Sequence, residues 1–246
     1  MKPVVVTPVV VTGPPRTSSA LVEELGRHGV ATVHEAMGRR GLLGADLRPA
    51  WPGARAAGTA VTALCLPGDN LTVHVAVELT GPGDVLVVTT TEPSLEGYIG
   101  ELLTTSLAAR GVTGLVTTTG IRDVADIAAA GFPAWSRAIN AQGTVKGAVG
   151  QVNRPVTIGG TTVRPGDAIV ADADGVVCVP RQEAAEVVAA SELRDVREAR
   201  ARQAYQKGSL SLDVSDLRAL ISDLGVEYVA WAEDMEAGRG GGWEDR

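Results

Sequence analysis

The chain has few cysteines and histidines, and their number and spacing exclude two classes of site. Its three histidines, His28, His34 and His74, show neither H-x-x-x-H nor H-E-x-x-H spacing, so a zinc-protease site is not expected. Cys65 and Cys178 are too far apart in sequence for a zinc knuckle, and both lie in apolar, strand-like runs. We therefore expect two buried thiols in a reducing compartment, and the cytoplasm as the location.

Several cofactor and nucleophile motifs are also missing. There is no G-x-S-x-G elbow, no Walker A loop and no G-x-G-x-x-G between a strand and a helix. Lysine is scarce, which leaves Lys146 as the lone candidate for a Schiff base. If the chain acts on a keto acid, a metal is the favoured electron sink. The available carboxylate and water ligands suit Mg²⁺ or Mn²⁺.

Positive charge and long apolar runs are lacking as well. The net charge of −7 and the pI near 5.0 argue against nucleic acid or an anionic membrane as a partner. No apolar run approaches the roughly 20 residues that span a bilayer, and a secretory signal is not expected. The 45% hydrophobic content and 246-residue length favour one folded domain over residues 1–246. Within it we expect an extended arm at 1–16 and a disordered tail at 236–246.

Hydrophobic periodicity, together with the positions of capping residues, glycines and prolines, predicts an α/β fold. A helix capped by Ser18 or Ser19 is expected to end at Arg27, and capping-box spacing from Thr32 to Glu35 predicts a short helix to Gly38. Further helices are predicted at 70–79, 102–110, 124–130, 182–207 and 214–224. Strands are predicted at 57–66, 85–89, 113–118, 144–152, 156–158, 162–163, 168–171 and 176–179. Alternation of helix and strand up to residue 130 indicates a parallel βαβ segment.

Two segments combine the groups of a plausible active site. Residues 97–103 (GYIGELL) read as a glycine-bounded loop that opens a helix, whose free amides can seat a carboxylate or phosphate. Residues 120–123 (GIRD) follow an apolar run and place Arg122 beside Asp123. Arginine can fork onto substrate oxygens, and aspartate can hold a hard divalent cation. Each segment alone also fits a structural role, as a tight turn before a capped helix or as a surface helix start.

Other acidic residues have simpler interpretations. Asp172 and Asp174 fit a hairpin turn better than a calcium loop. Glu192, Asp195 and Glu198 recur at a spacing of three among arginines, which is typical of a solvated, ion-paired helix face.

These motifs together resemble a known family. The resemblance covers about 29–229 and depends on short matches in order, at 31–42, 67–70 with His74, 81–84, 97–103, 120–123, 135–137, 141–146, 164–167 and 174–176. The chain is similar to the 4-hydroxy-4-methyl-2-oxoglutarate/4-carboxy-4-hydroxy-2-oxoadipate aldolases, class II pyruvate aldolases related to the regulators of ribonuclease E activity. Departures at 117–119, where relatives often carry an acidic residue, and at 213–216 bear on substrate range.

The resemblance implies residue roles. The amides of the loop Gly100, Glu101, Leu102 and Leu103 would bind the pyruvyl carboxylate. Arg122 would bind the keto or enolate oxygen. Asp123 would hold Mg²⁺ (or Mn²⁺), while Glu101, and Glu198 from a neighbouring subunit, would complete the site through water.

The resemblance also implies a fold and a reaction. The expected fold is a swivelling β/β/α domain, with C-terminal helices at 181–235 lying at the interface of a trimer or hexamer. The reaction would be metal-dependent cleavage of a 4-hydroxy-2-oxo di- or tricarboxylate to pyruvate plus oxaloacetate or pyruvate, through a metal-stabilised enolate. Oxaloacetate decarboxylation would be a side activity. The alternatives are a non-catalytic ribonuclease-binding regulator and a dedicated oxaloacetate decarboxylase.

Overall fold

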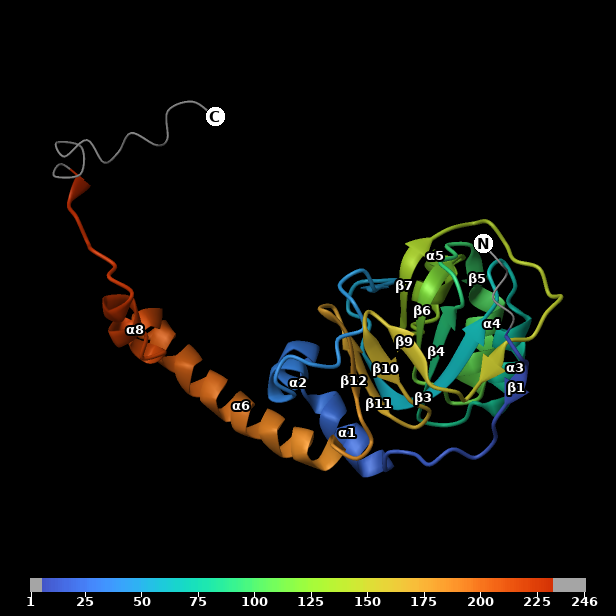
Figure 1. Ribbon diagram of the computed structural model, residues 1–246, viewed down its shortest axis with the longest axis horizontal. Helices are drawn as coiled ribbons and strands as arrows, with labels where there is room; N and C mark the ends of the chain where they lie inside the picture. The colour runs from blue at the N-terminus through green and yellow to red at the C-terminus, as the bar shows by residue number, and fades with distance from the viewer. Residues whose placement is uncertain (1–5, 232–246) are drawn as a thin grey trace. The chain divides into compact units, whose positions relative to one another are not determined.

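The computed structural model describes residues 6–231 and divides into two compact units, Met1–Asp195 and Val196–Arg246 (Figure 1). The predicted tail at 236–246 lies outside the described residues, as do residues 1–5 of the arm. No helix within 6–231 is long and apolar enough to cross a membrane.

The first unit is built on a large mixed sheet. Its described strands are β1 (Val9–Val10), β2 (Arg48–Pro49), β3 (Ala56–Cys65), β4 (Asp84–Thr90), β5 (Gly97–Ile99), β6 (Gly114–Ile121), β7 (Ala134–Ile139), β8 (Gln151–Val152), β11 (Ala168–Asp172) and β12 (Gly175–Val179). The order is β1-β8-β3-β4-β6-β7-β2, with β5 on β6, β11 on β3 and β12 on β11. β3, β4, β6 and β7 run parallel, which confirms the predicted parallel βαβ segment.

Alternating side chains of the central strand β4 face two cores. Leu86 and Val88 pack in a cluster with side chains of α3 (Leu71–Leu79), α4 (Glu101–Ala109) and α5 (Val124–Ala129). Val85 and Val87 pack in a second cluster with β11, β12 and the separate hairpin of β9 (Val156–Ile158) and β10 (Thr161–Val163). This two-sided burial explains why the parallel strands are nearly continuous apolar runs.

A third cluster completes the layers. The remaining face of β11 and β12 packs against α1 (Ser19–Arg27), α2 (Val30–Ala36) and the start of α6 (Ala184–Gln206). Figure 1 shows α1 and α2 beside β11 and β12. The arrangement of helices on one face and a second β layer on the other confirms the expected α/β, β/β/α fold.

Two helix predictions differ from the structure, one in its capping residue and one in its continuity. Thr32 does not cap α2, which begins at Val30. The cap comes from a distant hairpin, because Asp172 Oδ2 accepts the Val30 amide at 2.9 Å. The helix predicted over 214–224 is instead two short helices of the second unit, α7 (Ser211–Val214) and α8 (Arg218–Asp223), separated by Asp216 in the left-handed region.

The strand predictions differ from the structure at three segments. β7 was not predicted, although its Trp135 is fully buried. Residues 144–150 form no strand, because Asp69 Oδ2 accepts the amides of Gly147 and Ala148 in place of a sheet partner. The segment read as a loop at 97–99 is the short strand β5, paired with β6.

Other local predictions are confirmed. Ser18 caps α1, with its hydroxyl accepting the Leu21 amide. Asp172 pairs with Gly175 across the β11–β12 hairpin and accepts the Asp174 amide at 2.9 Å, so both aspartates are turn residues.

Candidate functional site

The candidate site lies where β6 ends and α4 begins. Ile99 ends β5 and leads through Gly100 into α4, while Ile121 ends β6 and leads into Arg122 and Asp123. The Arg122 amide donates to Ile99 O at 3.0 Å, so the two segments are bonded side by side. Parallel α/β sheets usually bind ligands outside the carboxyl ends of their strands, and this junction is such an end.

Asp123 has an unusual backbone conformation that aims its side chain back at α4. Its φ and ψ of 59° and 35° are left-handed, which aspartate tolerates better than most residues. Asp123 Oδ2 accepts the Glu101 amide at 3.2 Å and lies 3.7 Å from Arg122 Nε. The structure therefore brings three predicted site residues, Glu101, Arg122 and Asp123, into one cluster.

Gly100 is fitted against this cluster. An added Cβ at position 100 would overlap Asp123 Oδ2 and come within 3.0 Å of Arg122 Nε. The backbone at Gly100 is extended (φ −127°), so glycine is required here by space and not by conformation.

The start of α4 supplies the predicted amides, with one difference. The Glu101 amide is bound to Asp123. The amides of Leu102 and Leu103, in the first turn, have no acceptor within the helix and can receive an anion at its positive end. Thr105 Oγ1 donates to Glu101 Oε1 at 2.7 Å and fixes that carboxylate, and Leu102 is 81% exposed although apolar.

Sequence reasoning missed a loop that lies behind Arg122. The Asn140 amide donates to Ile121 O at 2.9 Å, and the Gly97 amide donates to Gln142 O at 2.7 Å. A Cβ at Gly143 would lie 3.2 Å from Arg122 Nη1. A side chain at position 143 would therefore crowd the guanidinium, which is otherwise about half exposed. The sequence signal for this loop was the family-like match at 141–146, to which no role in the site was given.

Glu198 lies on α6 in the second unit, so its predicted place in a neighbouring subunit's site stays a prediction. Lys146, the Schiff-base candidate, is exposed on the irregular segment 144–150.

The residues fit a divalent cation held mainly by non-protein ligands. Among the described residues, no three His, Cys, Asp or Glu side chains form a metal cage. Mg²⁺ commonly needs only one or two carboxylates, and it takes its other ligands from water and substrate. Asp123 is about half exposed and its Oδ2 is held by the Glu101 amide, so Oδ1 faces no protein donor in the described chain. Asp123 can therefore be a cation ligand.

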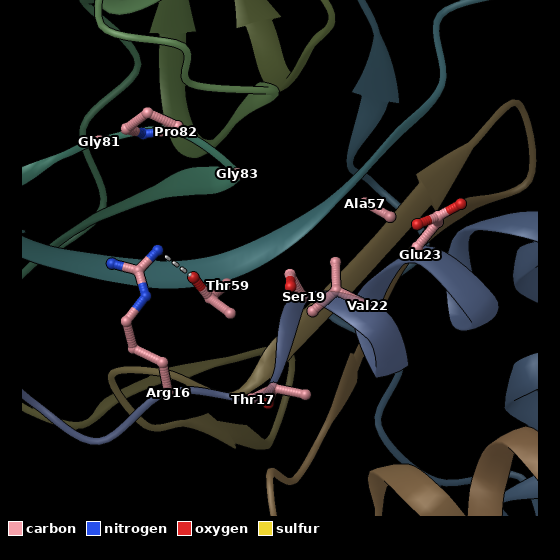
Figure 2. A pocket seen from close by; sticks show the side chains of 10 residues that line it. All are labelled: Arg16, Thr17, Ser19, Val22, Glu23, Ala57, Thr59, Gly81, Pro82 and Gly83. Carbon is pink, nitrogen blue, oxygen red and sulfur yellow. Dashed lines mark hydrogen bonds between the residues drawn. The ribbon is translucent and has the colours of Figure 1, made fainter.

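A separate cavity of about 440 Å³ lies at the opposite end of the sheet. Figure 2 shows Arg16 crossing it toward Thr59, below the Gly81–Gly83 turn that precedes β4. Arg16 is bound there to the fully buried Asp84 and, at 2.6 Å, to Thr59 Oγ1. Because its one cation is already paired, this cavity lacks the reactive groups of the candidate site.

Comparisons with known proteins agree with the geometry. The family model described as RraA-like, Aldolase/RraA, matches residues 30–178, and the chain belongs to this family. A protein of Halalkalibacterium halodurans, provisionally named 4-hydroxy-4-methyl-2-oxoglutarate aldolase, is 29% identical over 182 residues, which cover 74% of this chain and 84% of that protein.

Two solved structures have the same fold. An uncharacterized protein from Pseudomonas syringae pv. tomato matches with a TM-score of 0.71 and 26% identity, covering 82% of this chain and all of that one. Streptomyces coelicolor RraAS2 is described as an unusual member of the RNase ES inhibitor RraA family. It matches with a TM-score of 0.69 and 29% identity, and the match covers 77% of this chain and 99% of that one.

Proposed function

We propose that the protein cleaves a 4-hydroxy-2-oxo di- or tricarboxylate, such as 4-hydroxy-4-methyl-2-oxoglutarate or 4-carboxy-4-hydroxy-2-oxoadipate, by a retro-aldol reaction. The products are pyruvate and either oxaloacetate or a second pyruvate. The observation that carries the proposal is the cluster of Arg122, Asp123 and the α4 amides at one strand end. Relatives named as 4-hydroxy-4-methyl-2-oxoglutarate aldolases support it.

The cluster matches the charge that the reaction develops. The amides of Leu102 and Leu103 bind the carboxylate next to the keto group, and Arg122 donates to the keto oxygen. The C4 hydroxyl loses its proton to water, its oxygen forms the C4 carbonyl of the second product as the C3–C4 bond breaks, and the electron pair of that bond enters an enolate whose negative oxygen faces Arg122. Water then protonates C3 and pyruvate leaves.

Asp123, with Glu101 nearby, would hold Mg²⁺ or Mn²⁺. When bound, that cation supplies further positive charge at the keto oxygen. The chain's own contribution is to fix Asp123 through the Glu101 amide and to keep Gly100 free of a side chain. Oxaloacetate decarboxylation gives the same pyruvate enolate, and we propose it as a side activity.

The direct test is Arg122→Ala. Pyruvate release, followed with a coupled dehydrogenase, is expected to fall by at least about 100-fold, as when an oxyanion donor is removed. The circular dichroism spectrum should stay unchanged, because Arg122 is an exposed side chain. Activity should vanish with EDTA and return with Mg²⁺. Normal turnover in the folded variant would place the site elsewhere.

We further propose a homotrimer or homohexamer in which Glu198 completes the neighbouring subunit's site. Arg122→Ala and Glu198→Gln should then each be inactive alone, and a co-refolded mixture should regain part of the activity because some sites receive both native residues. No regain in a mixture shown to contain mixed oligomers would assign both residues to one subunit.

One observation favours a second function. The solved relative RraAS2 is described within a family of ribonuclease inhibitors. If this chain is a regulator, a purified RNase E-type enzyme should be inhibited at stoichiometric concentrations of the chain. The Arg122→Ala variant should then inhibit equally well, and no keto acid should be cleaved.

A further inference from the structure

A second cavity, of about 520 Å³, lies between the end of α2 and the β9–β10 hairpin. It is lined by His34, Arg39 and Arg40, by glycines of the two adjoining loops, and by Thr161. Its lining contains three potentially cationic side chains and no carboxylate. All of these residues belong to the first unit, and none belongs to the candidate active site.

Each of the two arginines is bound to a carboxylate that lies outside the cavity lining. Arg39 Nε donates to Glu35 Oε1 at 3.1 Å. Arg40 donates through Nη2 to Glu183 Oε2 at 2.9 Å and through Nε to a main-chain carbonyl. A guanidinium has five N–H donors, so each arginine keeps several for a ligand. The contacts restrict the directions of two exposed side chains, which lowers the entropy lost on binding.

The cavity lining differs in charge from the protein as a whole. The carboxylates that pair with Arg39 and Arg40, those of Glu35 and Glu183, lie outside the lining, which presents only cationic and neutral side chains. The whole chain has a net charge of −7.

His34 and the backbone add to the wall. His34 Nδ1 donates to Arg40 O at 2.9 Å, because a carbonyl only accepts, and this bond holds the backbone that carries Arg40. Gly41, Gly44 and Gly160 have positive φ angles of 84°, 102° and 82°, which keep side chains out of the loops around the cavity.

We propose that this cavity binds a small organic polyanion with two or more carboxylate or phosphate groups. Guanidinium pairs bind both groups through forked hydrogen bonds. The volume lies within the roughly 300–1,000 Å³ of sites that hold small organic ligands. The inference does not depend on the proposed lyase activity.

The test uses the full-length chain with Arg122→Ala, which weakens anion binding at the candidate active site. Citrate and pyrophosphate are titrated separately by calorimetry, with acetate as a monoanion. Saturable binding of citrate or pyrophosphate, but not acetate, is expected. Tighter binding of citrate would indicate a polycarboxylate ligand, and tighter binding of pyrophosphate a phosphorylated one.

Variants locate the binding. Arg39→Gln and Arg40→Gln should each raise the Kd about tenfold, as expected for a lost charge-assisted pair. Arg40→Lys should raise it less, since the charge stays and the fork is lost. Arg27→Gln is the matched control, because Arg27 is similarly exposed and ion-paired on α1 but lies outside the cavity.

Three results would overturn the proposal: no saturable binding of either polyanion, equal weakening by Arg27→Gln, or binding that is indifferent to Arg39 and Arg40. The exposed ion pairs removed contribute little to folding. If a glutamine variant nevertheless fails to fold, Arg40→Lys and Arg39→Lys replace it. A raised Kd in these variants supports the proposal, and an unchanged Kd contradicts it.

Discussion

The Asp123 carboxylate occupies the space in which any side chain at Gly100 would begin. One glycine therefore allows Asp123 to reach the Glu101 amide and to lie beside Arg122. The two halves of the candidate site, far apart in sequence, depend on this single close approach.

Gly100→Ala is accordingly a steric probe of the site. Its backbone is extended, so alanine adds no conformational strain, and its methyl group must displace Asp123 or Arg122. We expect pyruvate release to fall about 100-fold, since displacements near 1 Å at a reacting centre have effects of that order. Gly81→Ala is the control, because a Cβ there meets no atom within 4 Å. Equal activity in the two variants would show that the contact is irrelevant to turnover.

The sequence predicted which local segments carry the site but not how they meet. Short-range signals, the glycine before the α4 helix and the Arg-Asp pair after an apolar run, were enough to select the two segments with Arg122 and Asp123, whereas the role of Glu101 came from the family resemblance. The bond from the Glu101 amide to Asp123 Oδ2 joins residues 22 apart and follows from the pairing of β5 with β6. No local pattern specifies such a pairing.

The errors in the fold have the same origin. α2 begins before its apparent capping box because Asp172, 142 residues away, caps Val30. β7 lacks a simple alternation because Ala134, Trp135 and Ser136 are buried in succession on both faces of the sheet, whereas Arg137 and Ile139 are exposed. Tertiary contacts decided these elements, whereas capping and periodicity sufficed for α1, α3 and β4.

Asp123→Asn separates the charge of Asp123 from its geometry. The amide oxygen can still accept the Glu101 amide, while the negative charge for a cation is lost. We expect the Mg²⁺ concentration that gives half-maximal pyruvate release to rise at least about tenfold, because replacing even a residue that only orients a metal ligand weakens metal binding by about 10- to 100-fold. Gel filtration and thermal unfolding check the fold. An unchanged Mg²⁺ requirement would argue that the cation is held elsewhere.

Arg16 ties the N-terminal arm to the sheet. Its guanidinium is bound to Asp84, a fully buried carboxylate that also accepts from Thr59 and Gly81. Arg16→Met leaves that charge without its cation, which typically reduces stability by about 3–5 kcal/mol. Because Arg16 is 44% exposed and water can replace it, we expect about 2 kcal/mol in urea denaturation. Arg27→Met, which breaks only exposed pairs, should change stability by less than about 1 kcal/mol.

The two thiols should be unreactive in the folded protein. Burial raises the pKa of Cys65 to about 12, and burial followed by the charge of Asp167 raises the pKa of Cys178 well above its ordinary value. Because the thiolate is the nucleophile, labelling with a disulfide reagent at pH 8 should be negligible until denaturant is added. Two thiols should then react at once. Rapid labelling of either thiol in the native protein would contradict its burial.

His74 offers a test of how the segment at Lys146 lies against α3. Burial, and then the positive charge of Lys146, lower the pKa of His74 below 6.5. A lowered histidine pKa means that the unfolded chain binds the extra proton more readily. The stability from neutral His74 is therefore present above pH 6.5 and is lost as the pH falls through the folded pKa.

Lys146→Gln should raise the His74 pKa, which can be measured from the NMR shift of its ring proton. The pKa should return only part of the way to 6.5, because burial remains the larger cause. Lys207→Gln, in the turn that follows α6 in the second unit, is the control. A His74 titration that is identical in all three proteins would show that Lys146 does not act on the imidazole.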